Sequence, residues 1–189
     1  MLNPALFLDR DGVININHGY VHKRDQFDFI DEIFDLVKEA RRRGYKVVVI
    51  TNQAGIGRGY HTENDFHLLT DWMLNEFSSA GAPIDRVYFS PFHPTAGVGE
   101  YLKDDFSRKP HPGMILQAQR DLGVDLLLSV LIGDKESDIQ AGGAAGVGTN
   151  LLFAPQRPPS IEGLAYRNIA TLQDAIAFLQ ECNERVCSP

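Results

Sequence analysis

Two aspartates that follow a short apolar run are the residues in this sequence best suited to chemistry. Asp9 and Asp11 come directly after residues 5–8, and Gly12 lets the chain turn at once. Side chains two positions apart on an extended backbone point the same way, so both carboxylates can face one small volume. Such a pair repels unless a cation or a shared proton relieves it, and Mg²⁺ prefers oxygen ligands. Taken alone, the pair more often marks two solvated acids at the end of a strand.

Three more polar residues occupy comparable places elsewhere in the chain. Thr51 follows the apolar run 45–50, Asp134 follows the run 126–132, and Lys109 directly precedes a helical segment. Each alone has an ordinary explanation as a strand-end hydroxyl, a helix N-cap or a surface lysine. In a parallel sheet, however, ligands gather at the carboxyl ends of the strands, so these residues can converge with the aspartate pair.

The elements that must position these residues are predicted from the hydrophobic pattern. Apolar blocks of strand length alternate with segments in which apolar residues recur at helical spacing. We expect strands at 5–8, 45–50, 86–90, 126–132 and 147–153, an edge strand at 168–169, helices at 31–43, 62–79, 112–121, 139–145 and 171–182, and a rigid loop at 155–159. Alternating strands and helices predict an α/β fold, with a doubly wound, mostly parallel sheet sandwiched by helices.

Composition and charge exclude several classes of function. The chain has 189 residues, of which 43% are hydrophobic and 23% charged, as in one globular domain with a core. Its net charge of −7 argues against a nucleic-acid or anionic-membrane partner. No apolar stretch approaches the roughly 18 residues of a membrane span, and no secretory signal is visible. Cys182 and Cys187 are the two cysteines, which excludes a disulfide framework. We therefore expect a cytoplasmic protein with free thiols, and a monomer because no apolar stripe is obvious.

Together, the candidate residues can hydrolyse a phosphate monoester. Asp9 can attack phosphorus in line and form an aspartyl-phosphate, while Asp11 protonates the leaving alkoxide and later deprotonates a water. Thr51 and Lys109 can stabilise the equatorial oxygens. Mg²⁺ held by Asp9, Asp134 and the backbone carbonyl of Asp11 would neutralise charge on the transferring group.

The order of these motifs resembles the haloacid dehalogenase (HAD) superfamily of phosphohydrolases. The shared features are a DxD motif with a turn, a hydrophobic strand ending in threonine, a later lysine and a GDxxxD motif, here residues 133–138. Within the last motif, Asp138 lies one helical turn beyond Asp134 and can orient either the metal ligands or Lys135.

Longer strings are similar to the D-glycero-D-manno-heptose 1,7-bisphosphate phosphatases, whose relatives include histidinol-phosphatases. They are FLDRDGVIN, HGYVH, VVVITNQAGIGRG, RKPHPGM and GDKESD, within a resemblance that spans residues 5–152. The resemblance implies the roles given above and removal of one phosphate from the heptose bisphosphate in lipopolysaccharide or capsule biosynthesis. It also implies substrate contacts by Asn17, His18, Gly19, Tyr20, Asn52, Gln53, Arg108 and Lys135. Val13 stands where the family usually has threonine, a change that we expect to matter little.

One departure from this family concerns the loop at 91–110. Many members bind a structural zinc there through CxH and CxC pairs. The matching positions here hold Ser90, Phe92, Asp105 and Ser107. None of them offers a thiolate or an imidazole, and His93 and His111 nearby do not complete a tetrahedral site. We therefore predict no zinc and a loop held by aromatic packing. The candidates are Phe89, Phe92, Tyr101 and Phe106.

The chain has no room for a large cap domain, because the span from Asp9 to Thr51 already contains a helix and a strand. We expect a single HAD-like domain over residues 1–189 with an open site. Selectivity would then depend on the loops 12–26, 54–60 and 91–108. The segment 12–28 is either a substrate-contacting flap or an ordinary surface connection, and 91–110 lies on the substrate side.

A second phosphate could be held by Arg58, Arg108 and Lys135, which would favour a bisphosphate over a monophosphate. Arg10 points away from Asp9 on an extended strand, so we expect no contribution from it. Two other functions stay open. One is a histidinol-phosphate or other small phosphomonoester phosphatase, and the other is a non-enzymatic relic of the fold.

Overall fold

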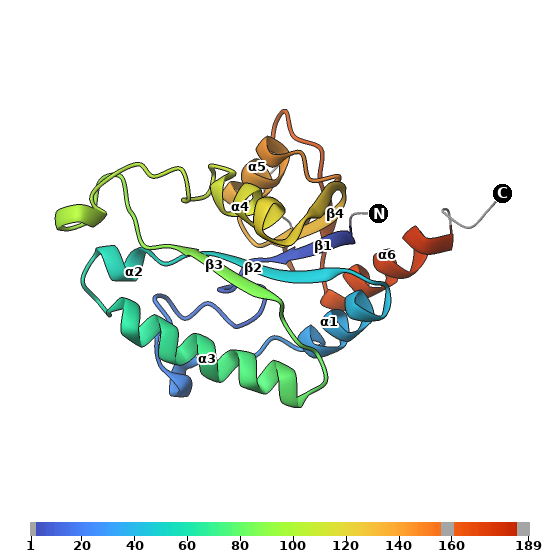
Figure 1. Ribbon diagram of the computed structural model, residues 1–189, viewed down its shortest axis with the longest axis horizontal. Coiled ribbons are helices and arrows are strands. Elements are labelled where there is room, and N and C mark those ends of the chain that lie inside the picture. Colours follow the sequence, from blue (N-terminus) through green and yellow to red (C-terminus); the bar gives the residue numbers. More distant parts are fainter. Residues whose placement is uncertain (1–2, 156–160, 185–189) are drawn as a thin grey trace.

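The computed structural model describes residues 3–155 and 161–184 (Figure 1). Six parallel strands form one sheet in the order β3-β2-β1-β4-β5-β6. They are β1 (Asn3–Leu8), β2 (Lys46–Asn52), β3 (Arg86–Ser90), β4 (Val124–Gly133), β5 (Thr149–Phe153) and β6 (Arg167–Ile169). The doubly wound parallel sheet predicted from the sequence is confirmed.

Helices cover both faces of this sheet (Figure 1). One face carries α1 (Ile33–Arg42), α3 (Glu63–Ser79) and α6 (Leu172–Glu184), and the other carries α4 (Gly113–Leu122) and α5 (Glu136–Ala145). Three short pieces were not predicted, namely α2 (Ala54–Gly57) and the 3-10 turns Arg24–Gln26 and Gly99–Tyr101. Each of them lies in a polar or glycine-rich segment, where no hydrophobic period exists to indicate a helix.

Alternation along β1 explains how the sheet is buried on both faces. Leu6 and Leu8 belong to the core under α1, α3 and α6, whereas Ala5 and Phe7 belong to the core under α4 and α5. Just beyond the strand the same alternation continues, since Asp9 contacts the loop before α4 and Arg10 contacts α3. The side chains of Asp9 and Arg10 therefore point toward opposite faces of the sheet.

The strand order reverses at β1, which lies between β2 and β4. In doubly wound sheets the crevice for ligands opens at such a reversal, outside the carboxyl ends of the strands. Because β1 ends at residue 8 and β4 at residue 133, Asp9 and Asp134 stand directly at this crevice. The backbone N–H of Asp9 donates to the carbonyl of Ile132 at 3.0 Å, which fixes the two strand ends relative to each other.

Helix α3, predicted at 62–79, begins with a capping box. The backbone N–H of Asp65 donates to Thr62 Oγ1 at 3.1 Å, and the N–H of Thr62 donates to Asp65 Oδ2 at 2.8 Å.

The loop predicted at 155–159 falls, beyond its first residue, outside the described residues, as does Cys187. Within the described residues, no helix has both the length and the apolar character that crossing a membrane requires.

Candidate active site

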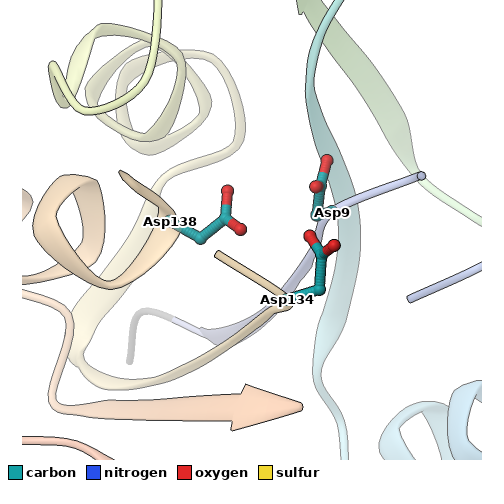
Figure 2. A group of neighbouring side chains, drawn as sticks. All are labelled: Asp9, Asp134 and Asp138. Carbon is teal, nitrogen blue, oxygen red and sulfur yellow. The ribbon is translucent and has the colours of Figure 1, made fainter. Parts of the chain in front are cut away.

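Three aspartates converge where β1, β4 and α5 meet (Figure 2). Asp9, Asp134 and Asp138 each offer a carboxylate oxygen, and these oxygens all lie within 4.8 Å of one another. Asp9 and Asp138 are buried and Asp134 is partly buried. Burial and the charge of Asp9 raise the pKa of Asp134 to about 7. An oxygen-preferring cation would relieve this repulsion, so the donor set fits Mg²⁺.

Lys109 contributes the positive charge inside this cluster. Its Nζ lies 2.6 Å from Asp138 Oδ1 and 2.9 Å from Asp9 Oδ1, and it donates to the carbonyl of Ile50 at 2.9 Å. The side chain is 3% exposed. Burial by itself lowers the pKa of Lys109, but the carboxylates of Asp138 and Asp9 outweigh it and hold that pKa above the ordinary value. Lys109 is therefore an ammonium group aimed at the predicted nucleophile.

Lys135 approaches the same cluster from the solvent side. Its Nζ lies 3.3 Å from Asp134 Oδ1, and its side chain is 52% exposed. Its backbone N–H donates to Asp138 Oδ2 at 2.9 Å, so this aspartate closes the first turn of α5. From the sequence, Lys135 is predicted to hold a second phosphate together with Arg58 and Arg108. In the structure its ammonium group lies against Asp134.

Gly12 brings the turn after β1 close to the aspartate cluster. Its φ is +107°, and a β carbon at this position would collide with the carboxylate of Asp134. Both the backbone conformation and the available space therefore require glycine. Gly12 of the DxDG motif therefore allows both the turn after β1 and the close approach of this turn to Asp134.

Three donors hold the carboxylate of Asp11. Arg10 Nη2 lies 2.9 Å from both oxygens, Asn15 Nδ2 lies 3.1 Å from Oδ1, and Gln53 Nε2 lies 3.0 Å from Oδ2. From the sequence we expected no contribution from Arg10, because it leaves the strand on the side opposite Asp9. It does so, but its length carries the guanidinium to the second aspartate.

Arg10 is one of the largest fully buried side chains, with 1% exposure. Its Cζ lies 6.0 Å from the ring centroid of Phe27 and 5.9 Å from that of Phe66, and Nη2 donates to the carbonyl of Val21 at 2.7 Å. This side chain thus connects Asp11 to the loop 12–28 and to α3. In the sequence, the only indication of this role is that Arg10 closely follows an apolar strand. A cation buried at such a place needs a charged or polar partner.

The two polar residues after Thr51 hold their neighbours in place. Gln53 Nε2 donates to Thr51 Oγ1 at 2.8 Å as well as to Asp11, so it connects the hydroxyl and the carboxylate. Asn52 Nδ2 donates to the carbonyl of Lys109 at 2.9 Å, and Asn52 Oδ1 accepts from the Lys109 N–H at 3.0 Å. Residues 52 and 53 were predicted to contact substrate. In this structure their amide groups bind predicted catalytic residues.

The tip of the loop 12–28 is held by local polar contacts at the surface. His18 Nε2 lies 2.8 Å from Asp28 Oδ2, and the N–H of Gly19 donates to Asn17 Oδ1 at 3.1 Å. All four residues are solvent-accessible, and Asn17 also lines a cavity beside the aspartate cluster.

Tyr20 lies on the other side of the same loop, near Arg58. The guanidinium carbon of Arg58 is 5.7 Å from the centroid of the Tyr20 ring. Tyr20 also contacts Tyr60 edge to face, with ring centroids 4.8 Å apart. The φ of Tyr20 is +51°, an uncommon conformation for a residue other than glycine. Tyr60 was not predicted as a site residue.

Two guanidinium groups, those of Arg58 and Arg108, lie close together beyond the β3 side of the cluster. Arg108 Nη1 donates to the carbonyl of Phe92 at 2.9 Å. Burial and the charge of Arg58 lower the pKa of Arg108. Among the residues that the structure describes, neither guanidinium forms an ion pair with a carboxylate. This region is therefore electropositive and suited to an anion.

Toward β5 and β6 the crevice opens into a cavity of about 840 Å³. Much of its lining is apolar, including Phe29, Leu152 and Ile161. Its charged lining residues are all acidic, namely Asp31, Glu32, Asp134 and Glu136. Carboxylates repel a phosphate, so the basic side suits a second phosphate and the cavity does not.

Polar contacts hold the base of the loop 91–110. Ser107 Oγ donates to Ser90 Oγ at 3.0 Å or to Asp105 Oδ1 at 2.6 Å, and the N–H of Ser107 donates to the same aspartate oxygen at 2.9 Å. All three residues occupy positions that match zinc ligands in the family. A hydrogen-bonded cluster thus occupies three of the positions at which the family resemblance implies zinc ligands in many members.

Aromatic packing contributes only in part to holding this loop. Phe92 and Tyr101 contact each other, with ring centroids 6.0 Å apart, as predicted. Phe89 packs instead on Phe66 of α3, with centroids 4.3 Å apart. Phe106 is 59% exposed and stabilises little.

Comparisons with known proteins agree with this geometry. The HAD-hydrolase-like family model matches residues 106–152. The D-glycero-alpha-D-manno-heptose-1,7-bisphosphate 7-phosphatase of Burkholderia mallei is 53% identical over 179 residues, which cover 95% of either chain. The D-glycero-beta-D-manno-heptose-1,7-bisphosphate 7-phosphatase of Escherichia coli K12 is 44% identical over 183 residues, which cover 94% of this chain and 96% of that protein.

Solved structures show the same fold. A putative HAD-like phosphatase from Mesorhizobium loti has a TM-score of 0.85 at 35% identity, covering 95% of this chain and 87% of that chain. The D,D-heptose 1,7-bisphosphate phosphatase from B. bronchiseptica, complexed with magnesium and phosphate, has a TM-score of 0.78 at 25% identity, covering 94% of this chain and 98% of that chain.

The fold and its converging aspartates thus define a phosphohydrolase of the HAD superfamily. Relatives that are 44–53% identical over nearly the whole chain narrow this class further. The chain belongs to the D-glycero-D-manno-heptose-1,7-bisphosphate 7-phosphatase family, which confirms the resemblance seen in its motifs.

Proposed function

We propose that this chain is a Mg²⁺-dependent phosphomonoester hydrolase that removes one phosphate from D-glycero-D-manno-heptose 1,7-bisphosphate. The observation that carries the proposal is the convergence of Asp9, Asp134 and Lys109 at the strand-order reversal, in a chain of this family. The names of the relatives differ in the anomer, so both anomers are candidate substrates.

Asp9 is the nucleophile that attacks phosphorus in line and forms an aspartyl-phosphate. Lys109 Nζ at 2.9 Å and the N–H of Arg10 at 2.7 Å both contact Asp9 Oδ1, which leaves Oδ2 for the attack. Lys109 and the Thr51 hydroxyl stabilise the equatorial oxygens. Asp11 gives a proton to the leaving alkoxide and then takes one from the water that cleaves the intermediate.

Asp9, Asp134 and the backbone carbonyl of Asp11 would hold Mg²⁺. When bound, the metal supplies positive charge that offsets the charge of the transferring phosphoryl group. The raised pKa of Asp134, caused by burial and by Asp9, supports a cation at this place. Asp138 keeps Lys109 directed at the nucleophile from 2.6 Å.

The substrate would extend from the aspartate cluster toward Arg58 and Arg108, which bind the phosphate that is not cleaved. The positive charge of these two guanidinium groups, which form no ion pair with any described carboxylate, supports this direction. The acidic lining of the cavity on the other side opposes the reverse one. We propose that the loops 12–28 and 91–110 supply the selectivity of a single domain without a large cap.

The loop 91–110 would need no zinc, because the contacts among Ser90, Asp105 and Ser107 already hold its base. A cytoplasmic monomer acting on a small sugar phosphate, with no nucleic-acid or membrane partner, is in keeping with the net charge of −7.

Phosphate release from both anomers of the heptose bisphosphate, with Mg²⁺ and with histidinol phosphate in parallel, tests the function. We expect one phosphate per bisphosphate, and no turnover by Asp9→Asn. Asp71→Asn, at an exposed position of α3, is the control and should behave as wild type. Good turnover of histidinol phosphate with poor turnover of both bisphosphates would refute the substrate assignment. An active Asp9→Asn variant would refute the mechanism.

A further inference from the structure

Two hydrogen bonds fix the protonation state of His93. The backbone N–H groups of Thr95 and Ala96 lie 3.2 and 3.0 Å from its Nδ1. A backbone N–H can only donate, so Nδ1 is the unprotonated nitrogen, and a neutral ring then carries its proton on Nε2. Burial and the charges of Arg108 and Arg58 lower the pKa of His93, which keeps the ring neutral near pH 7.

The Nε2–H of His93 faces another donor. Arg58 Nη2 lies 3.1 Å from His93 Nε2, and a guanidinium has no acceptor. Arg58 Nε is buried without a hydrogen-bond partner among the described residues, and Arg108 adds a second guanidinium nearby. Several donors therefore meet where an acceptor is needed, and an anion with several oxygens would satisfy them together.

Close packing holds these donors in position. Arg58 directly follows Gly57, where a β carbon would collide with the carbonyl of Pro91. The N–H of Val98 donates to the carbonyl of Gly57 at 2.8 Å, which joins α2 to the loop that carries His93. A donor group built from two firmly joined segments needs little ordering when a ligand binds.

We propose that His93 is a substrate-positioning residue whose Nε2–H binds the phosphate that is not cleaved, together with Arg58 and Arg108. The proposal rests on the function proposed above and adds a neutral donor to its second phosphate subsite. A phosphate oxygen placed between His93 Nε2 and Arg58 Nη2 accepts from both groups. The role needs a substrate with a second phosphate, so it should not affect a simple monoester.

Two substitutions distinguish the loss of the Nε2–H donor from the loss of the hydrogen bonds that His93 accepts within the loop. In His93→Asn the amide oxygen can accept from the Thr95 and Ala96 N–H groups in place of Nδ1, but nothing replaces Nε2–H. In His93→Gln the amide nitrogen reaches toward the Nε2 position and keeps a donor. We expect His93→Asn to raise KM for the heptose bisphosphate about tenfold, the usual cost of a lost hydrogen bond to a charged group, with kcat little changed.

The monoester p-nitrophenyl phosphate supplies the comparison, and its kcat/KM should change less than about twofold in His93→Asn. His93→Gln should recover most of the bisphosphate KM. His111→Asn, which alters a histidine just after the loop whose side chain is 40% exposed, is the control and should match wild type with both substrates. Equal losses with both substrates would indicate a structural role and overturn the proposal.

The tautomer is tested separately by ¹⁵N NMR of the imidazole nitrogens in wild type. We expect an unprotonated Nδ1 and a protonated Nε2, and a protonated Nδ1 would overturn the proposal whatever the kinetics show. The two proposals fail differently. Without the proposed function, wild type releases no phosphate from the bisphosphate. Without the role of His93, wild type is active and His93→Asn matches it.

Discussion

Replacing Lys109 with methionine should destabilise the protein, because it removes the cation from a group of buried carboxylates. Lys109 Nζ lies 2.6 Å from Asp138 and 2.9 Å from Asp9. At an effective dielectric constant of about 20, each ion pair contributes about 6 kcal/mol of attraction before the cost of burial is subtracted. Methionine keeps the apolar stem of the side chain, so the change removes mainly charge.

The loss of stability has an upper limit, because a carboxylate left without its partner can take up a proton. Protonating a carboxyl group of ordinary pKa at pH 7 costs about 4 kcal/mol. Lys109→Met should therefore lower the free energy of unfolding by about 3–4 kcal/mol, which is the usual result of breaking a buried ion pair. Adding Asp138→Asn removes one of the uncompensated charges, so the double variant should recover about 2 kcal/mol without recovering activity.

Urea unfolding at pH 7 in EDTA measures these values, and phosphate release measures activity. Lys135→Met is the matched control, since that ammonium is 52% exposed and 3.3 Å from Asp134, and its loss should cost less than about 1 kcal/mol. The cost of Lys109→Met should shrink at pH 5, where protonation is cheaper. If the costs of Lys109→Met and Asp138→Asn simply add, the uncompensated charge is not the cause and the reasoning fails.

Arg10→Met should lower kcat by about 100-fold, because Asp11 loses the guanidinium that holds its carboxylate, while circular dichroism stays that of wild type; a kcat within about threefold of wild type would contradict this role. Burial and a neighbouring carboxylate raise the pKa of Tyr88 from 10.0 to about 12, so the folded state disfavours the phenolate. The stability that this provides is complete below pH 10 and is lost as the pH rises toward 12; Tyr88→Phe should abolish this part of the decline in urea midpoint, and an unchanged profile would refute it. Ser107→Ala should lower the free energy of unfolding by about 1–2 kcal/mol through its lost hydrogen bonds with Ser90 and a nearby aspartate. Wild-type stability should not respond to zinc or to a zinc chelator, whereas stabilisation by zinc would contradict a loop held by these contacts.

The sheet and the long helices could be predicted because burial on both faces leaves a strong pattern. Residues 45–50 and 86–90 are apolar strands bounded by polar turns, and the structure contains β2 and β3 there. The short helix α2 could not be predicted, since a four-residue helix in a glycine-rich segment has no period to detect. Its position depends on contacts with the loop 91–110, which no local pattern reports.

The site was predictable to the extent that its residues stand at strand ends. Asp9 and Asp134 converge as expected because they follow adjacent strands of the sheet, and Lys109 reaches them from the segment before α4. The partners of these residues depend on side-chain length, which topology does not fix. Arg10 reaches Asp11 by this means, and the ammonium group of Lys135 reaches Asp134.

The alternation across the strand end divides the proposed chemistry between the two faces of the sheet. Asp9 is held by Lys109 on the side of α4 and α5, whereas Asp11 is held by Arg10, which is packed against Phe66 of α3. Each carboxylate therefore takes its position from a different hydrophobic layer. Arg10 also donates to the carbonyl of Val21, so the position of Asp11 is linked to the loop 12–28 whereas that of Asp9 is linked to Lys109. One DRD tripeptide would thereby place the proposed nucleophile and the proposed acid/base group on separate supports.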